Sequence, residues 1–430
     1  QMMVINRCVD PLSKLGVTRW IKRTCYKEMA GYRDLDFDVT YFYRSMDHLL
    51  TVKDDLEFAI FEKLKDLFSV NVKLTFYDIT SSYFYTDNCE IGKNGYSRDN
   101  RPDREQIVIG VVTSFEGYPI KHYVFEGNRK DETTVKQVVG QLKSEYNIED
   151  TTFVGDRGMI TKLNLARLEG EGFDYIMGVK HRQDEICSML LSEQVDEEDH
   201  QLYKGLKIRE RTVTVKEFLI WKCQKIIREQ KPDLADERFS LLQKEILSLN
   251  NKSKPESRDY KRIVESIIKG IDTPAYNKIF RGIKKYQGRY EDELRYIICL
   301  NEERKFGSQN KRQISISKLS EELDKVFAQN TRYKEERDID KAINKIFEGY
   351  KVKFKKFFTI ARDVKSKKAI GYSLNQAKIE QEKKFDGIFV LLSSRYDLKP
   401  SEVVESYKNL KEVEMLFDDL KNFVDIRPIR

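Results

Sequence analysis

Two aspartates occupy positions where a strand-forming sequence gains little from a carboxylate. Asp78 lies in the middle of residues 74–85, a run rich in aromatic and β-branched residues that is predicted to form a strand. Asp156 ends the segment 151–156, which is predicted to be a short buried strand. Each has an ordinary interpretation: Asp78 could face solvent or pair with a basic side chain, and Asp156 could cap the helix after Met159. The chemical interpretation is that both carboxylates bind a metal ion.

The secondary structure predicted around Asp78 and Asp156 helps to decide between the ordinary and the metal-binding interpretation. The predicted order is strand, strand, strand, helix, strand, helix and strand, over residues 74–85, 106–115, 118–126, 132–146, 151–156, 160–169 and 173–179. The tight turn Glu116-Gly117 makes the first three strands an antiparallel meander. This order is that of a ribonuclease H-like architecture, an α/β fold with a mixed five-stranded sheet flanked by helices. In such a sheet the first and fourth strands are neighbours.

The two aspartates are therefore expected to approach each other, although they are far apart in sequence. Two carboxylates brought together repel unless a cation lies between them, and oxygen ligands of this type suit Mg²⁺ or Mn²⁺. The strand order thus favours a divalent metal site at Asp78 and Asp156.

The whole chain divides into four predicted regions. We expect an N-terminal helical region over 1–70, the first part of the core over 71–185, an inserted α+β domain over 186–385, and a return to the core over 386–430. The first region includes a basic helix, with Arg19, Lys22 and Arg23, that is either a solvated surface or a DNA-backbone contact. The insertion is rich in Lys and Glu, so its helices could be coiled or DNA-facing, and residues 250–257 read as a loop within it.

The last predicted element is a helix over residues 401–423. Tyr407, Glu414 and Lys421 are spaced by seven residues each, which places them on one stripe of an α-helix. Such a stripe is either a solvated helix edge or part of a site.

Composition limits the class of protein. At 430 residues the chain is long enough for two or three domains, and 40% hydrophobic with 35% charged residues argues against wholesale disorder. Lys and Arg outnumber Asp and Glu by 78 to 71, a balance that permits a polyanionic partner without requiring one. The six cysteines have no zinc-ligand spacing, and no run of 18 apolar residues is present. We therefore expect a cytoplasmic protein without structural zinc or a membrane partner.

Several short motifs, in their order, resemble the DDE transposases of bacterial insertion sequences, in the branch with a Tyr-Arg-Glu-Lys signature. These motifs are Asn6-Arg7, Asp10-Pro11-Leu12-Ser13-Lys14, Tyr43-Arg44-Ser45-Met46-Asp47, Tyr77-Asp78-Ile79-Thr80, Gly95-Tyr96-Ser97-Arg98-Asp99, Arg101-Pro102-Asp103, Gly155-Asp156-Arg157-Gly158-Met159 and Phe385-Asp386-Gly387. The signature itself is Tyr, two residues, Arg, three residues, Glu, six residues, Lys. Tyr407, Glu414 and Lys421 match it in register, and Leu410 stands at the arginine position.

The resemblance implies roles for these residues. Asp78, Asp156 and Glu414 would be the catalytic residues and would hold two divalent ions, Mg²⁺ or Mn²⁺. Tyr407 and Lys421 would position the scissile phosphate. The remaining implied DNA-backbone contacts are Arg157, Arg98 and Arg101. Glu414 is singled out by the resemblance alone.

The resemblance also implies a function. We expect a transposase that cleaves double-stranded DNA at the ends of an insertion sequence and transfers the strands to target DNA. It would act as a homodimer in the DNA complex, in the bacterial cytoplasm and associated with the nucleoid when bound. Two alternatives remain: a ribonuclease H-like nuclease without strand transfer, and a catalytically inactive, transposase-derived DNA-binding protein, for which Leu410 at the signature arginine position is the sequence argument.

Overall fold

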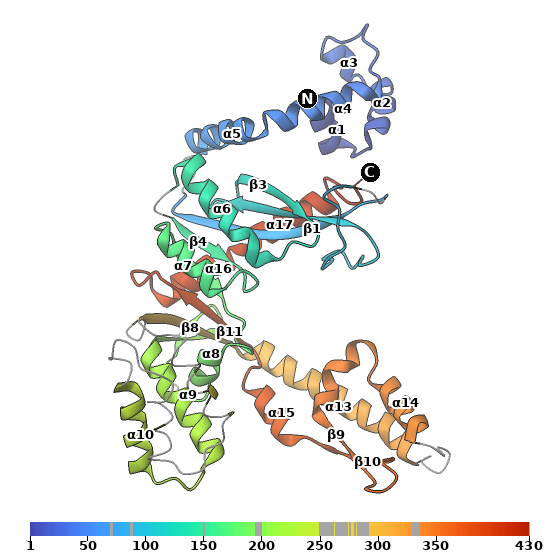
Figure 1. Ribbon diagram of the computed structural model, residues 1–430. Helices are drawn as coiled ribbons and strands as arrows, with labels where there is room; N and C mark the ends of the chain where they lie inside the picture. Colours follow the sequence, from blue (N-terminus) through green and yellow to red (C-terminus); the bar gives the residue numbers. More distant parts are fainter. Residues whose placement is uncertain are drawn as a thin grey trace. The chain divides into compact units, whose positions relative to one another are not determined.

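The computed structural model describes most of the chain and divides it into two compact units (Figure 1). The described residues are 1–68, 72–86, 89–148, 151–193, 200–248, 262, 274, 277–278, 281, 292–328 and 336–429. The first unit comprises residues 1–179 and 391–430, and the second comprises residues 180–390. The predicted loop at 250–257 lies outside the described residues.

A mixed sheet forms the centre of the first unit. Its strands are β1 (Leu74–Tyr83), β2 (Gln106–Thr113), β3 (Pro119–Glu126), β4 (Thr152–Gly155), β5 (Asp174–Gly178) and the end of β11 (Ile388–Ser393). Among the described residues of this unit, the strand order is β3-β2-β1-β4-β5-β11. β1 is antiparallel to β2 and parallel to β4, so the predicted neighbourhood of the first and fourth strands is confirmed.

The prediction of a five-stranded sheet is not confirmed, because the sheet of the first unit includes a further strand. Leu391 to Ser393 of β11 pair antiparallel with Ile176 to Gly178 of β5. The chain returns from the second unit along the edge of β5, whose backbone groups would otherwise lack partners. The sheet of the first unit therefore gains a sixth strand.

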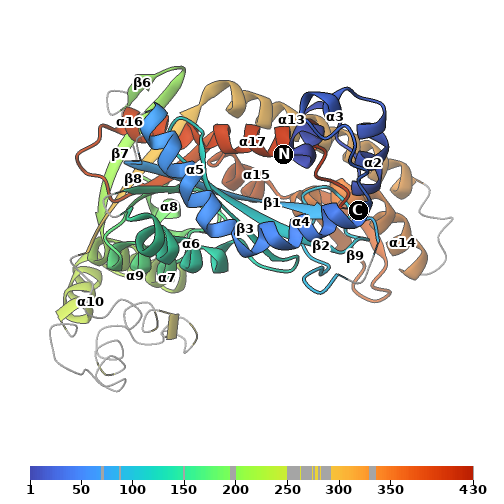
Figure 2. The same ribbon diagram turned by 90° about the horizontal axis from the view of Figure 1, so that it is seen from above.

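Helices cover both faces of this sheet (Figure 2). On one side, α6 (Asp131–Tyr146) packs against α7 (Lys162–Gly170), and the Tyr77 hydroxyl donates a hydrogen bond of 2.9 Å to Thr134 of α6. On the other side, α17 (Leu410–Asn422) packs on β1, and α16 (Pro400–Lys408) packs on β4 and β5. Because side chains alternate along a strand, Asp78 faces the side opposite to Tyr77, where α17 lies.

The single helix predicted over 401–423 is interrupted at Asn409. The N–H of Asn409 donates to the carbonyl groups of Glu405 and Ser406, both at 3.2 Å, and the next helix starts at Leu410. Tyr407 therefore lies on α16, whereas Glu414 and Lys421 lie on α17.

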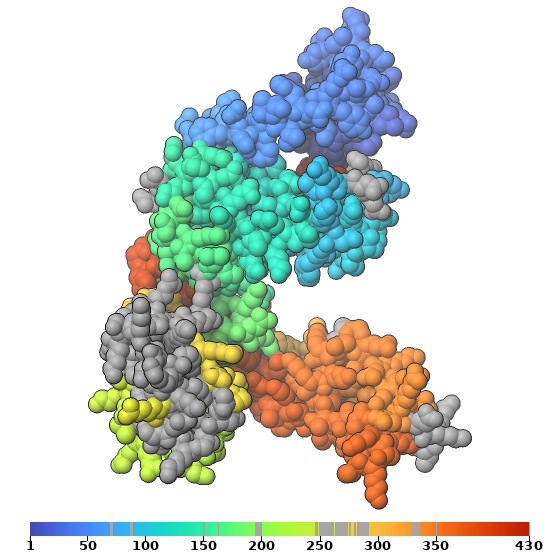
Figure 3. Space-filling model, viewed as in Figure 1, coloured from blue at the N-terminus to red at the C-terminus, as the bar shows by residue number. Residues whose placement is uncertain are grey.

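The N-terminal region is helical. Its helices are α1 (Met2–Val9), α2 (Lys14–Lys22), α3 (Tyr26–Met29), α4 (Val39–Thr51) and α5 (Lys53–Phe68). A small core of Val17, Trp20, Ile21 and Phe42 joins α2 to α4, and α5 packs on β3. These helices are the blue part of Figure 3.

The second unit has α+β composition. An antiparallel meander of β6 (Gln201–Tyr203), β7 (Leu206–Thr214) and β8 (Glu293–Asn301) is accompanied by α8 (Glu185–Leu190), α9 (Val215–Gln230) and α10 (Asp236–Ser248). The remaining elements are α13 (Glu302–Ala328), α14 (Glu336–Ile346), the 3₁₀ helix η4 (Gly349–Phe357), β9 (Phe358–Arg362), β10 (Ala369–Leu374) and α15 (Gln376–Lys383). They share an apolar core that includes Leu323, Ile339 and Phe358.

Candidate active site

The register of β1 and β4 brings Asp78 and Asp156 to neighbouring positions. Tyr77 is paired with Gly155 in the parallel ladder, so the next residue on each strand is one of the two aspartates. Asp156 directly follows the end of β4. Both carboxylates thus lie where the parallel strands β1 and β4 leave their shared ladder.

Asp78 is half-buried, and its electrostatic surroundings are unfavourable for a negative charge. Burial raises the pKa of Asp78 to about 7, and the negative charges of Asp156 and Glu414 act in the same direction. A 2.8 Å hydrogen bond from the N–H of Ile79 and the positive charge of Arg98 oppose this rise. Both other predicted acids therefore disfavour a negative charge on Asp78.

Tyr407 holds Asp156 in place. Its hydroxyl donates a hydrogen bond of 3.0 Å to Oδ1 of Asp156. The hydroxyl lies so close to the end of β5 that a Cβ atom at Gly178 would be 2.4 Å from it. Gly178 is thus a site residue that the sequence reasoning missed, since a glycine at a strand end gives no signal of its own.

Glu414 is an exposed residue on the side of α17 that carries buried residues. In an α-helix it falls within about 60° of Leu410, Phe417 and Lys421, which are all buried. The side chain of Glu414 is nevertheless exposed. Its charge acts on Asp78 of β1, the strand on which α17 packs.

Lys421 is engaged in a buried ion pair. Its Nζ atom donates to Oδ1 of Asp99 at 2.9 Å, and Arg427 donates to the same oxygen. The side chains of Asp99 and Lys421 are only 1% and 8% exposed. Lys421 would have to leave Asp99 before it could contact a phosphate.

The three predicted arginine contacts differ in position. Arg98 donates to both carboxylate oxygens of Asp131, at 2.9 and 3.0 Å. The Arg157 side chain is 62% exposed and lies 3.9 Å from Asp156. Arg101 instead pairs with Asp103 and lies over the ring of Tyr83. Arg98 and Arg157 therefore border the aspartates, and Arg101 is bound within its own loop.

The chemistry of the donors fits a divalent cation. The charges of Asp156 and Glu414 both disfavour a charge on Asp78, and a cation between these carboxylates would remove that cost. Within the described part of the chain, however, no three His, Cys, Asp or Glu side chains are gathered into a ready-made metal site. Metal binding would therefore require side-chain movement, which the exposed Glu414 permits.

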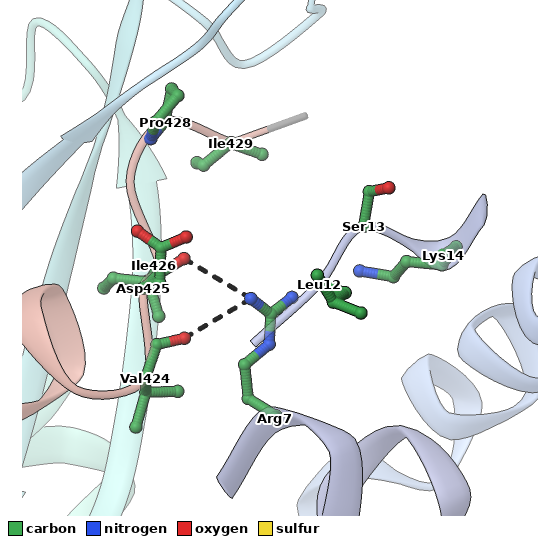
Figure 4. A pocket seen from close by; sticks show the side chains of 9 residues that line it. All are labelled: Arg7, Leu12, Ser13, Lys14, Val424, Asp425, Ile426, Pro428 and Ile429. Atoms are coloured by element: carbon green, nitrogen blue, oxygen red, sulfur yellow. Dashed lines mark hydrogen bonds between the residues drawn. The ribbon is translucent and has the colours of Figure 1, made fainter. Parts of the chain in front are cut away.

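A separate cavity of about 300 Å³ lies between the N-terminal helices and the C-terminal segment of the first unit (Figure 4). Arg7 donates to the carbonyl oxygens of Val424 and Asp425, both at 3.3 Å. Burial, and then the positive charge of Arg7, lower the pKa of Lys14, which lies on the same side of the cavity as Arg7. The hydrogen bonds of Arg7 connect α1 to the segment that follows α17.

Comparison with known proteins assigns the chain to a family. Residues 75–430 match the family of transposase DDE domains. This match covers well over half of the chain, so the protein belongs to that family. No curated protein matches the chain. Among the described residues, no helix is both long enough and apolar enough to cross a bilayer.

Two of the solved structures that match the chain show low similarity to it. One is a piggyBac transposase synaptic complex with hairpin DNA, with 13% identity over 48% of this chain and a TM-score of 0.29. The other is a Mos1 transposase paired-end complex with the left transposon end, with 10% identity over 67% of this chain and 79% of that one, and a TM-score of 0.19. The matched part spans 46% of the piggyBac chain.

Proposed function

We propose that this protein is the transposase of a bacterial insertion sequence, in the branch with the Tyr-Arg-Glu-Lys signature. It would cleave double-stranded DNA at the ends of the element and transfer the strands to target DNA, using divalent metal ions. The observation that carries the proposal is the adjacency of Asp78 on β1 and Asp156 directly after β4, together with the charge of Glu414 acting on Asp78. Family membership supports the same chemistry.

Asp78, Asp156 and Glu414 would hold the ions. The chemistry that two bound Mg²⁺ or Mn²⁺ ions supply is activation of a water or a 3′-hydroxyl and stabilisation of the leaving oxygen. Burial raises the pKa of Asp78 to about 7, so a cation would compete with a proton for this carboxylate near neutral pH. Tyr407 keeps Asp156 oriented through its hydrogen bond.

DNA would be held by basic residues around the carboxylates. Arg157 is exposed beside Asp156 and can contact a phosphate oxygen without breaking a strong ion pair. Arg98, Arg101 and Lys421 are bound to Asp131, Asp103 and Asp99, so each would exchange a carboxylate for a phosphate. We further propose a homodimer that pairs two DNA ends in the bacterial cytoplasm.

The test is cleavage of DNA carrying the element's ends in the presence of Mg²⁺. Asp156→Asn should reduce the cleavage rate at least about 100-fold, because a neutral amide is a poor ligand for Mg²⁺. Asp418→Asn, at an exposed position of α17, is the matched control and should cleave normally. Undiminished cleavage by Asp156→Asn would exclude the assigned site. Joined donor and target DNA would separate a transposase from a nuclease of the same fold.

A second candidate is a DNA-binding protein that has lost catalysis. Leu410 stands at the signature arginine position and is 8% exposed. Because its side chain is apolar, it cannot supply the positive charge of the signature arginine. Lys421 is also held by Asp99. Uptake of Mn²⁺ by the wild-type protein at pH 8 would argue against this alternative.

A further inference from the structure

The cavity of the first unit brings together two sequence motifs that the candidate active site does not use (Figure 4). Arg7 of the Asn6-Arg7 motif and Lys14 of the motif at residues 10–14 both line it. Asn6 fixes the chain between them, because its side-chain oxygen accepts the Leu12 N–H at 3.3 Å. Two cationic side chains are therefore held on one side of a cavity of about 300 Å³.

These two cations have no counter-ion within the described part of the chain. Asp425 also lines the cavity, but no carboxylate of the described residues lies within 4 Å of Arg7 or Lys14. The hydrogen bonds of Arg7 go to two neutral backbone carbonyl groups, both at 3.3 Å. Burial, and then the charge of Arg7, lower the pKa of Lys14. An anion between the two side chains would remove the cost of this repulsion.

A second buried lysine of the first unit shows the opposite arrangement. Burial alone would lower the pKa of Lys121, but hydrogen bonds to Glu145 at 2.7 Å and to Asp54 at 3.0 Å raise it. There the lysine is neutralised by carboxylates of the chain itself. At Lys14 the positive charge is left for a partner from outside.

Two further features of the N-terminal side of the cavity favour an anion. The side-chain nitrogen Nδ2 of Asn6 is buried and has no hydrogen-bond partner among the described residues. Helix α2 begins at Lys14 and has no acidic residue in its first turn, and the N-terminus of a helix favours a negative charge. The donor and the helix end thus act in the same direction as the two cations.

The opposite wall of the cavity is largely apolar. It belongs to the C-terminal segment, and its apolar lining residues are Val424, Ile426, Pro428 and Ile429. An apolar wall with a few convergent polar groups is typical of a site for a small organic ligand. The cavity is therefore suited to an anionic group that carries an apolar or planar body.

We propose that this cavity binds the terminal phosphate of a nucleotide, with the phosphate at Arg7 and Lys14 and the nucleoside against the apolar wall. A phosphate inside a DNA strand is flanked by a nucleotide on each side, which a cavity of about 300 Å³ does not accommodate. The nucleotide is either free or the 5′-phosphorylated end of a DNA strand. The site is separate from the three carboxylates, so this inference does not depend on the proposed function.

The test is calorimetric titration in a buffer free of metal ions and phosphate, at low salt, with thymidine 5′-monophosphate as the probe. Wild-type protein should bind this nucleotide more tightly than it binds inorganic phosphate, and thymidine should not bind. Lys14→Gln should bind the nucleotide at least about 10-fold more weakly, because it loses a charge-assisted hydrogen bond to the phosphate.

Lys22→Gln is the matched control. It removes a positive charge from the other end of α2, where Lys22 is exposed and lies 3.6 Å from Asp36, and it should bind the nucleotide as wild type does. Urea unfolding separates binding from folding. Lys14→Gln should be at least as stable as wild type, because it relieves the repulsion from Arg7, whereas a merely structural lysine would be missed.

A hairpin oligonucleotide with a 5′-phosphate identifies the source of the nucleotide. If it displaces thymidine 5′-monophosphate and its 5′-hydroxyl form does not, the site takes a DNA end. If neither form displaces it, the site takes a free nucleotide. The inference is overturned if wild type does not bind the nucleotide more tightly than phosphate, if thymidine binds equally, or if the 5′-hydroxyl form competes equally. It is also overturned if Lys14→Gln binds as wild type or is less stable, or if Lys22→Gln loses binding equally.

Discussion

The side chain of Tyr407 can approach Asp156 only because residue 178 has no Cβ atom. A methyl group at this position would lie 2.4 Å from the hydroxyl oxygen, in a place where the Arg157 backbone nitrogen is also only 3.3 Å away. The hydrogen bond that orients Asp156 therefore depends on a residue from a third strand. At the scale of single residues, this is the most specific requirement of the candidate site.

Gly178→Ala should displace the Tyr407 hydroxyl and weaken its hydrogen bond to Asp156. We expect DNA cleavage to fall at least about 10-fold, since small misplacements at an active site are costly, and stability to fall by about 1–3 kcal/mol through overpacking. The cleavage rate and urea unfolding check the two effects.

Gly140→Ala is the control for that substitution. Gly140 lies on the exposed face of α6 with no atom within 4 Å of the added Cβ, so alanine there should leave activity unchanged and stabilise the helix by up to about 1 kcal/mol. Equal losses in the two variants would contradict the role assigned to Gly178.

At the scale of elements, the strands were predictable because their patterns are local. Alternation, β-branched residues and the Glu116-Gly117 turn identify β1, β2 and β3, and the order of elements implies the neighbourhood of β1 and β4. The apolar residues of β7 continue beyond it to Ile220, but the strand ends at Thr214. There the hydroxyl of Thr214 accepts the Glu217 N–H and starts α9. A strand and a helix made of similar apolar residues differ mainly in such a cap.

The contacts that complete the site were not predictable, because they are long-range. The spacing of Tyr407 and Glu414 assumes one continuous helix, and the interruption at Asn409 places them on two. The pairing of Lys421 with Asp99 joins residues that are 322 positions apart. The role of Glu414 came from family resemblance, since its type and spacing do not distinguish it from other glutamates.

The contact between α5 and β3 predicts how the stability of the fold depends on pH. Burial alone would raise the pKa of Glu57, but hydrogen bonds from His122 of β3 and Lys53 lower it to about 2. Because the pKa is lower in the folded state, Glu57 stabilises the fold above about pH 4.5, and this contribution is lost as the pH falls toward 2.

Glu57→Gln should therefore reduce stability at pH 6 by up to about 3 kcal/mol and make it less sensitive to acid between pH 5 and 3. Urea unfolding at several pH values measures this dependence. Glu62→Gln removes an exposed carboxylate from the same helix and should leave the acid sensitivity as in wild type. If Glu57→Gln loses stability in acid as steeply as wild type, the attachment does not depend on this carboxylate.

At the scale of the whole molecule, the candidate metal ligands all belong to one of the two units. Asp78, Asp156 and Glu414 lie within residues 1–179 and 391–430, whereas residues 180–390 have their own apolar core. A ligand that binds only the folded form stabilises the part that contains its site.

We therefore expect calorimetry to show two thermal transitions. Mn²⁺ should raise the midpoint temperature of only one of them. At pH 8, where Asp78 is ionised, an excess of 100 times the dissociation constant should add about 2.7 kcal/mol to the first unit. The shift should be absent in Asp156→Asn and diminished at pH 6, where Asp78 is protonated. A shift of both transitions, or of neither, would be inconsistent with a metal site confined to the first unit.

The second unit leaves and re-enters the first at two residues that face each other. Gly178 and Leu391 are partners in the antiparallel pairing of β5 and β11, so residues 180–390 occupy the position of a hairpin loop. The entropy cost of closing a flexible loop grows only logarithmically with length, by about 0.6 kcal/mol for each doubling. Segments of very different size can therefore be exchanged at this junction during evolution, or replaced by a short turn in the laboratory, without changing the register that aligns the two aspartates.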